Sequence, residues 1–218
     1  MEVEWIHFKE IASTHEYAKA HAGEFDPKKC SCFTAESQTA GRGRYQNRSW
    51  VSKKGNLHLT FFLSTTPKPY LAQLLAFSAA ELIGNGVMMK WPNDLIFEGK
   101  KFSGTIAEVT DHGIVLSIGM NVNESVEADQ PTTTLKAITG KEWDLNTLSK
   151  SIVAQFLQNL RRGFPSKRVE DLLAYRGEKI RCDQVEGILL GINEEGFLRL
   201  KTEDGEIKII HSGEINRG

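Results

Sequence analysis

The stretch that decides the fold is VMMKWPNDLIFEGKKFSGTIAEVTDHGIVLSI, residues 87–118. Short apolar runs alternate in it with turn-forming groups, of which Glu98-Gly99-Lys100 and Asp111-His112-Gly113 are the clearest. Apolar runs this short, broken this often, favour strands over helices. We therefore expect an antiparallel meander with strands at residues 87–90, 95–97, 101–109 and 114–118.

The segments on either side complete an α/β pattern. Ser13-Thr14-His15-Glu16 is a capping box, and apolar residues recur at helical spacing after Pro69, which we expect in a first turn, and again before Gly163. Further strand-like runs are found at residues 3–8, 30–35 and 57–63. We expect helices over residues 14–21, 71–83, 146–162 and 169–175. The predicted fold is an α/β fold with a mixed β-sheet flanked by helices.

The pattern changes near the C-terminus. From Lys179 onward, brief strand-like runs are separated by glycines, and Asp204-Gly205 is a hairpin signal. A segment of this kind is typical of a small β-barrel. We expect a larger domain over residues 1–175 and a small barrel domain over residues 176–218.

The composition excludes several classes of protein. With 27 basic and 28 acidic residues, the 218-residue chain has a formal charge of -1, whereas duplex-DNA binders usually carry a basic excess. No apolar run has the length of a signal peptide or a membrane span, so we expect a soluble, cytoplasmic protein. The three cysteines lack a metal-ligand or disulfide pattern and are interpreted as buried thiols, and His58 is expected to face away from the core.

Two segments carry the chemistry. GRGR at residues 41–44 combines two arginines, rich in N–H donors, with glycines that allow close backbone approach, which is how a loop grips an anion. KWPND at residues 90–94 adds a cation and a carboxylate in a segment stiffened by Pro92. Together they predict binding of a phosphate ester with its metal ion.

Arg-Gly sequences also occur in flexible RNA-binding tails, so a non-catalytic nucleotide- or RNA-binding module stays an alternative. Such tails are long and repetitive, whereas GRGR occurs once here, between two strand-like runs. That position favours a binding site in a loop.

The order and spacing of several motifs resemble the biotin protein ligases. These motifs are Ser13-Thr14, ESQTAGRGR at 36–44, Trp50, KWPND at 90–94, KFSG at 101–104 and GMNVN at 119–123. The resemblance covers nearly the whole chain, although no DNA-binding domain of the repressor type is seen ahead of Trp5. It implies a catalytic fold of the class II aminoacyl-tRNA synthetase type followed by an SH3-like barrel.

For such a ligase the resemblance implies that ATP activates biotin as biotinyl-5′-AMP, from which biotin passes to a lysine of the biotin carboxyl carrier protein of acetyl-CoA carboxylase. Mg²⁺ would accompany ATP without a direct protein ligand, and Asp94 would act on it only indirectly. The nearest alternative is a lipoate or octanoate ligase or transferase of the same fold, whose Arg-Arg-x-x-Gly-Gly-Gly loop is absent here. DNA and membranes are not expected partners, and monomer and homodimer both stay open.

The resemblance also assigns roles to residues. Catalytic roles are expected for Lys101, Arg42 and Arg44. Biotin is expected to contact Ser13, Thr14, His15, Gln38, Arg42, Gly43, Arg44, Lys101 and Gly104. ATP is expected to contact Arg44, Arg48, Trp50, Lys90, Asn93, Asp94 and Asn121.

Two positions depart from the family pattern. His15 replaces an asparagine, and the loop before Trp50 has one extra residue, which leaves Arg48 as the candidate for a third loop arginine. We expect the loop of residues 41–50 to close as a lid over the reactive acyl-adenylate.

Overall fold

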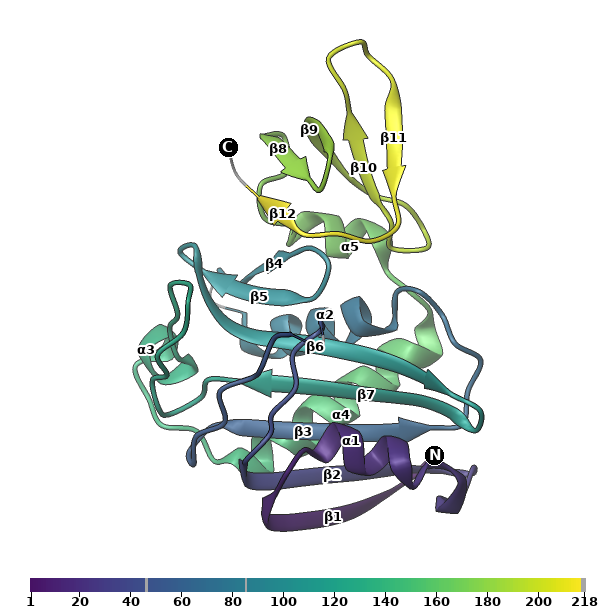
Figure 1. Cartoon of the computed structure of the whole chain (residues 1–218), viewed down its shortest axis with the longest axis vertical. Coiled ribbons are helices and arrows are strands. Elements are labelled where there is room, and N and C mark those ends of the chain that lie inside the picture. Colours follow the sequence, from purple (N-terminus) through teal and green to yellow (C-terminus); the bar gives the residue numbers. More distant parts are fainter. Residues whose placement is uncertain (46, 85, 217–218) are drawn as a thin grey trace.

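The computed structural model describes residues 1–45, 47–84 and 86–216 and contains two β-sheets (Figure 1). The larger sheet has seven strands with parallel and antiparallel pairs, and the smaller has five strands that pair antiparallel. The smaller sheet is the C-terminal part of the chain. The predicted fold, a mixed sheet with helices and an all-β C-terminal unit, is confirmed.

The seven-stranded sheet has the order β1-β2-β3-β7-β6-β5-β4. Its strands are β1 (Glu2–Ile11), β2 (Lys29–Gln38), β3 (Leu57–Leu63), β4 (Met88–Lys90), β5 (Asp94–Phe97), β6 (Lys100–Thr110) and β7 (Gly113–Met120). The predicted meander is confirmed, because β4 to β7 pair antiparallel in succession. β1 and β2 pair in parallel, because α1 (Thr14–Ala20) and the 3-10 helix η1 (Ala22–Glu24) carry the chain back between them.

Helices cover both faces of this sheet (Figure 1). α2 (Leu71–Ile83) and α4 (Leu145–Arg162) pack against one face and form the main core with it. α1 packs on the other face, where its Ala18 joins Phe33 and Phe62 in a second, smaller core. Because β3 lies between both layers, it is buried along its whole length. The candidate site opens on the α1 face.

A short helix lies where one was predicted, but its bounds differ: α5 spans Ser166–Asp171, not residues 169–175. Beyond α5, Met89 N donates to Leu172 O at 2.7 Å, and Ala174 N donates to Met89 O at 2.9 Å. The chain therefore pairs with β4 instead of continuing as a helix, and Tyr175 adopts a left-handed φ of 66°.

Two smaller differences concern helix ends. Pro69 lies one residue before the N-cap of α2, not in its first turn. α3 (Leu135–Thr139) was not predicted, although Thr134 caps it by accepting from Ala137 N at 3.0 Å and Gly140 ends it with a φ of 73°. A helix this short has too little apolar periodicity to be recognised.

The C-terminal sheet has the order β11-β10-β9-β8-β12. Its strands are β8 (Lys179–Cys182), β9 (Val185–Ile192), β10 (Leu198–Lys201), β11 (Ile207–Ile210) and β12 (Ile215–Asn216). Gly196 connects it to the larger sheet, because its carbonyl accepts from Gln73 Nε2 at 2.8 Å and from Trp91 Nε1 at 2.9 Å. These buried bonds fix the small sheet beside the KWPND segment. The residue at which two domains divide stays a prediction.

Two expectations concern the chain as a whole. The three cysteines are buried and form no disulfide with one another, as expected. Among the described helices, none combines the length and the apolar character that crossing a bilayer requires.

Candidate active site

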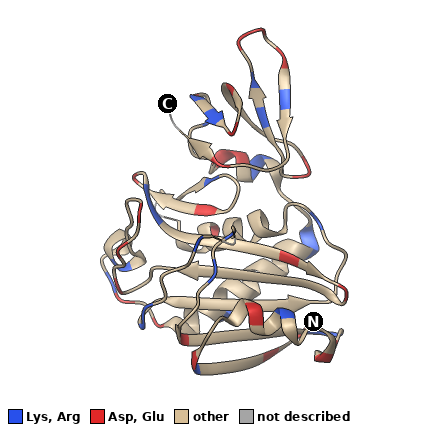
Figure 2. Cartoon of the chain, viewed as in Figure 1, with Lys and Arg blue, Asp and Glu red and all other residues tan. Residues whose placement is uncertain are grey.

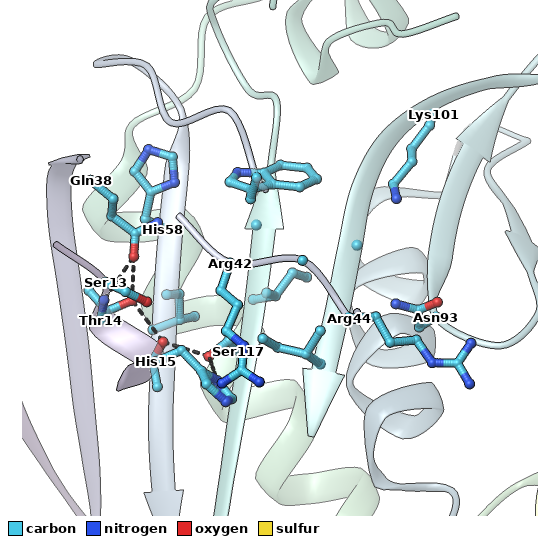
Figure 3. Close-up of a pocket in the computed structure, with 18 residues that line it drawn as sticks. Ser13, Thr14, His15, Gln38, Arg42, Arg44, His58, Asn93, Lys101 and Ser117 are labelled. Carbon is cyan, nitrogen blue, oxygen red and sulfur yellow. Dashed lines mark hydrogen bonds between the residues drawn. The ribbon is translucent and has the colours of Figure 1, made fainter. Parts of the chain in front are cut away.

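A pocket lies on the α1 face of the seven-stranded sheet (Figure 3). Strands β3, β6 and β7 contribute to its wall, the start of α1 lies at one end, and the loop of residues 41–50 borders it. Every residue expected to contact biotin lines this pocket, namely Ser13, Thr14, His15, Gln38, Arg42, Gly43, Arg44, Lys101 and Gly104. The fold thus brings together segments that are far apart in the sequence.

One end of the pocket carries a continuous chain of hydrogen-bonded side chains. Gln38 Oε1 accepts from Thr14 N at 2.8 Å and from Thr14 Oγ1 at 3.0 Å. The Thr14 hydroxyl lies 2.8 Å from Thr60 Oγ1, which in turn lies 2.6 Å from Ser117 Oγ. Ser117 Oγ lies 2.7 Å from His15 Nδ1. These groups hold one another in place across α1 and three strands.

His15, which replaces the family asparagine, is a link in this chain. Its Nε2 lies 2.9 Å from Glu108 Oε2, so both ring nitrogens have partners. Burial lowers the pKa of His15, and Glu108 opposes that shift only in part. Burial alone would raise the pKa of Glu108, but hydrogen bonds from Lys19 and His15 outweigh this effect and lower it. The pair is therefore a neutral imidazole beside an ionised carboxylate at neutral pH.

The GRGR loop is a short hairpin. Gly43 N donates to Arg48 O, and Trp50 N donates to Gly41 O, each at 2.9 Å. A Cβ at Gly41 would lie 2.3 Å from Trp50 O, and one at Gly43 would lie 2.9 Å from Arg48 O. The glycines therefore allow the two arms of the hairpin to approach each other, in addition to any approach to a ligand.

Arg42 extends from this hairpin toward the end of the pocket that holds His15 (Figure 3). It pairs with Glu16 and with Glu108, whose Oε2 lies 3.1 Å from Arg42 Nη1. Figure 2 shows the acidic positions on α1 and β6 and the basic positions along the loop. An anionic ligand that draws on Arg42 would have to compete with two carboxylates.

The next two arginines of the loop reach the segment before β12. Arg44 Nη1 donates to Gly213 O at 2.8 Å. Arg48 bonds to both carboxylate oxygens of Glu214, at 2.7 and 3.0 Å. The hairpin is therefore tied to the C-terminal sheet, a contact between positions more than 160 residues apart in the sequence.

Lys101 lies at the other end of the pocket (Figure 3). Its Nζ is 2.7 Å from Asp94 Oδ1, and both side chains are largely buried. Burial raises the pKa of Asp94, and Lys101 opposes that rise. A Cβ at Gly104 would lie 3.2 Å from Asp94 Oδ1 and 3.4 Å from Lys101 Nζ. Gly104 therefore leaves this pair the room it needs.

A second cavity adjoins the pocket and shares Gly43, Arg44, Trp50, Asn93 and Lys101 with it. The residues expected to contact ATP line it with one exception: Arg44, Arg48, Trp50, Asn93, Asp94 and Asn121. The exception is Lys90. It lies opposite Asp94 in the register of β4 and β5, and it lines neither cavity. Arg217, whose role the sequence leaves open, lies outside the described residues.

The Trp50 ring borders both cavities. A Cβ at Gly119 would lie 2.5 Å from Trp50 Cε2, so the ring lies directly on the backbone of β7. Lys101 Nζ is 5.9 Å from the centre of the ring. The Trp50 Nε1 donor is buried and has no hydrogen-bond partner among the described residues. Trp50 therefore stands between the Lys101 ammonium and the glycine backbone of β7.

Several residues of this pocket were not predicted from the sequence. His58 faces away from the main core that Leu57 and Leu59 join, as expected, but it is only 2 % exposed and lines the pocket, because both faces of β3 are covered. Thr60 and Ser117 were not singled out by any motif, and Glu108 carries no sequence signal at all. The alternation of polar His58 and Thr60 with Leu57, Leu59 and Phe61 was the available clue to the pocket wall.

Two family models match this chain. Residues 7–124 match the family model described as the biotin/lipoate A/B protein ligase family, and residues 179–218 match the biotin protein ligase C terminal domain. The bifunctional ligase/repressor BirA of Escherichia coli is 33% identical over 239 residues, covering 94% of this chain and 71% of that protein.

Two further relatives extend the comparison. The biotin--[acetyl-CoA-carboxylase] ligase of Mycobacterium tuberculosis is 26% identical, covering 83% of this chain and 76% of that protein. The solved structure of the biotin protein ligase from Aquifex aeolicus in complex with biotin and ATP superimposes with a TM-score of 0.84 at 31% identity. It covers 98% of this chain and 97% of that one.

Proposed function

The chain belongs to the biotin/lipoate A/B protein ligase family, and we propose that it acts within this family as a biotin protein ligase. It activates biotin with ATP as biotinyl-5′-AMP and then transfers the biotinyl group to a lysine of the biotin carboxyl carrier protein of acetyl-CoA carboxylase. The acceptor is inferred from relatives with that name. The bound biotin and ATP of the Aquifex aeolicus structure support the two small-molecule substrates.

The observation that carries the proposal is the junction of the two cavities. They meet at Gly43, Arg44, Trp50, Asn93 and Lys101, so an acid bound in the first can reach a nucleotide bound in the second. A site that must join a carboxylate to a phosphate needs such a junction, lined by cations that offset the charge of both anions.

In the first step, a carboxylate oxygen of biotin attacks the α-phosphorus of ATP, and the bond to pyrophosphate breaks. Lys101 holds the carboxylate and the α-phosphate oxygens, and Arg44 adds a second cation at the junction. Asp94 positions Lys101 through the 2.7 Å contact between them. No covalent intermediate with the protein is needed.

In the second step, the acceptor lysine amine attacks the biotinyl carbonyl carbon, and AMP leaves. The acyl-adenylate is sensitive to water before that attack, so it must be covered. The hairpin of residues 41–50 borders both cavities and provides that cover, with the flat ring of Trp50 beside the nucleotide.

Mg²⁺ enters this scheme as part of the substrate Mg-ATP. Within residues 1–45, 47–84 and 86–216, no group of three or more His, Cys, Asp or Glu side chains could hold a metal ion. Asp94, the carboxylate at the junction, is already paired with Lys101. A Mg²⁺ ion that keeps its waters and binds phosphate oxygens fits this set of residues better than one held by a protein cage.

The test is ATP–pyrophosphate exchange with biotin, with lipoate and with neither acid. We expect exchange that depends on biotin, followed by biotinylation of a purified carrier domain detected with streptavidin. Exchange with lipoate or octanoate alone would favour the alternative within the same family. Nucleotide binding without acid-dependent exchange would favour a non-catalytic nucleotide- or RNA-binding module.

A further inference from the structure

His58 is the buried residue of the pocket that is least explained by the fold. It lies on β3 with only 2 % of its surface exposed, and neither ring nitrogen has a hydrogen-bond partner among the described residues. Figure 3 places it beside Gln38, at the end of the pocket away from Lys101. Burying a polar group without a partner costs stability, so such a group usually has a role.

The other polar side chains at this end have partners within the protein, and the Ser13 hydroxyl accepts from the backbone N–H of Glu16. Gln38 Oε1 accepts twice from Thr14, and Gln38 Nε2 donates to Ser52 Oγ at 2.9 Å. The hydroxyls of Thr60 and Ser117 also have partners within the pocket wall. A ligand that brings hydrogen-bonding groups to this end therefore meets an imidazole that no other described side chain engages, with the backbone of Lys53 beside it.

We propose that His58 determines which acid the pocket accepts, by exchanging hydrogen bonds with the polar ring of a cyclic urea. This inference rests on the proposed function and names the residue that selects its substrate. A urea ring offers both N–H donors and a carbonyl acceptor. The dithiolane ring of lipoate offers neither, so it would leave the imidazole buried and unpaired.

The His58 imidazole is uncharged at neutral pH. Burial lowers the pKa of His58 to about 4, and the nearby backbone of Lys53 opposes that shift only in part. At neutral pH the imidazole is uncharged, with one nitrogen that donates and one that accepts. It therefore matches a group that has both a donor and an acceptor, and it offers no charge to an anion.

The experiment measures biotin binding to the full chain by titration calorimetry, and ATP–pyrophosphate exchange with biotin and with lipoate. H58F keeps a flat ring but removes both nitrogens, and H58Q keeps a donor and an acceptor. S31A is the matched control, because Ser31 also has a buried, unpartnered hydroxyl, on β2, and lines neither cavity. Thermal melting of each variant reports folding.

We expect H58F to weaken biotin binding about tenfold and to lower the preference for biotin over lipoate by a similar factor. H58Q should recover most of the binding, S31A should match the wild type, and the KM for ATP should stay constant. A folded H58F that binds biotin within twofold of the wild type would overturn the inference. A wild-type chain that binds no biotin would instead overturn the proposed function.

A second measurement on the wild-type chain does not depend on how H58F folds. In protein labelled with ¹⁵N-histidine, the ring nitrogens of His58, identified by their loss in H58Q, should shift when biotin is added and not when lipoate is added. Unchanged His58 signals in biotin-saturated protein would refute the hydrogen bond.

Discussion

Lys101 Nζ lies 2.7 Å from Asp94 Oδ1, at the point where the two cavities meet. The register of β5 and β6, in which Asp94 faces Gly104, places the carboxylate where the lysine can reach it. The pair is largely buried, so each charge depends on the other for its solvation. Asp94 therefore holds the Lys101 ammonium at the place where the anions of both substrates would meet it.

We expect K101A to lower the rate of adenylate formation far more than it lowers stability. A cation of this kind, aimed at charge that develops in the transition state, contributes about 2 to 4 kcal/mol to catalysis. ATP–pyrophosphate exchange measures this loss. K100A is the matched control, because Lys100 is exposed on the same strand and lines neither cavity. Near-normal exchange in a folded K101A would end the assignment of Lys101.

The local elements were predictable because their signals are local. Helix α2 combines apolar residues at helical spacing with Gly84 after its last turn, and the meander has a turn-former at each break. The candidate site residues of the loop and of KWPND could be proposed from the sequence because the chemistry of anion binding restricts which residues can serve. Both kinds of information are contained in a few adjacent residues.

What escaped prediction depends on contacts between distant positions. The partner that ends α5 early, Met89, is more than 80 residues away in the sequence. The burial of His58 follows from the position of β3 between two helix layers, which the alternation of residues 57–63 does not reveal. Likewise, the pairing of Arg42 with Glu108 exists only after β6 and the loop have come together.

We expect G119A to weaken ATP binding. The added Cβ would lie 2.5 Å from Trp50 Cε2, so the ring must move off β7 into the space between the two cavities. Overpacking of this size costs about 1 to 3 kcal/mol, and we expect the KM for ATP to rise more than the KM for biotin. The control is a double-mutant cycle: in a W50A background, G119A should have little further effect. An equal effect in both backgrounds would contradict the contact.

We expect His58 to make the protein less stable in acid. The pKa of His58 is about 4 in the folded chain, below its ordinary value of 6.5, so the unfolded chain takes up the proton first as pH falls. The stability present above pH 6.5 is therefore lost toward pH 4, by about 3 kcal/mol for this residue alone. Urea unfolding from pH 7 to pH 4 should show a smaller loss in H58F than in the wild type. Parallel curves would mean that His58 does not titrate in this way.

The last prediction concerns the hairpin of residues 41–50 as a lid. Its ties to the C-terminal sheet include the exposed pair of Arg48 with Glu214, and exposed ion pairs contribute little to stability. The hairpin should therefore open readily in the free protein and be held closed when biotin and ATP offer anions to its arginines.

Limited trypsin digestion measures this opening at the hairpin arginines Arg42, Arg44 and Arg48. We expect biotin with ATP to protect these sites, and E214Q to speed cleavage in the free protein by removing the charge that holds Arg48. Cleavage at Lys208 on β11, away from both cavities, is the internal control and should not respond to ligands. Equal cleavage of the hairpin with and without ligands would refute the lid, because closure must exclude the protease as it excludes water.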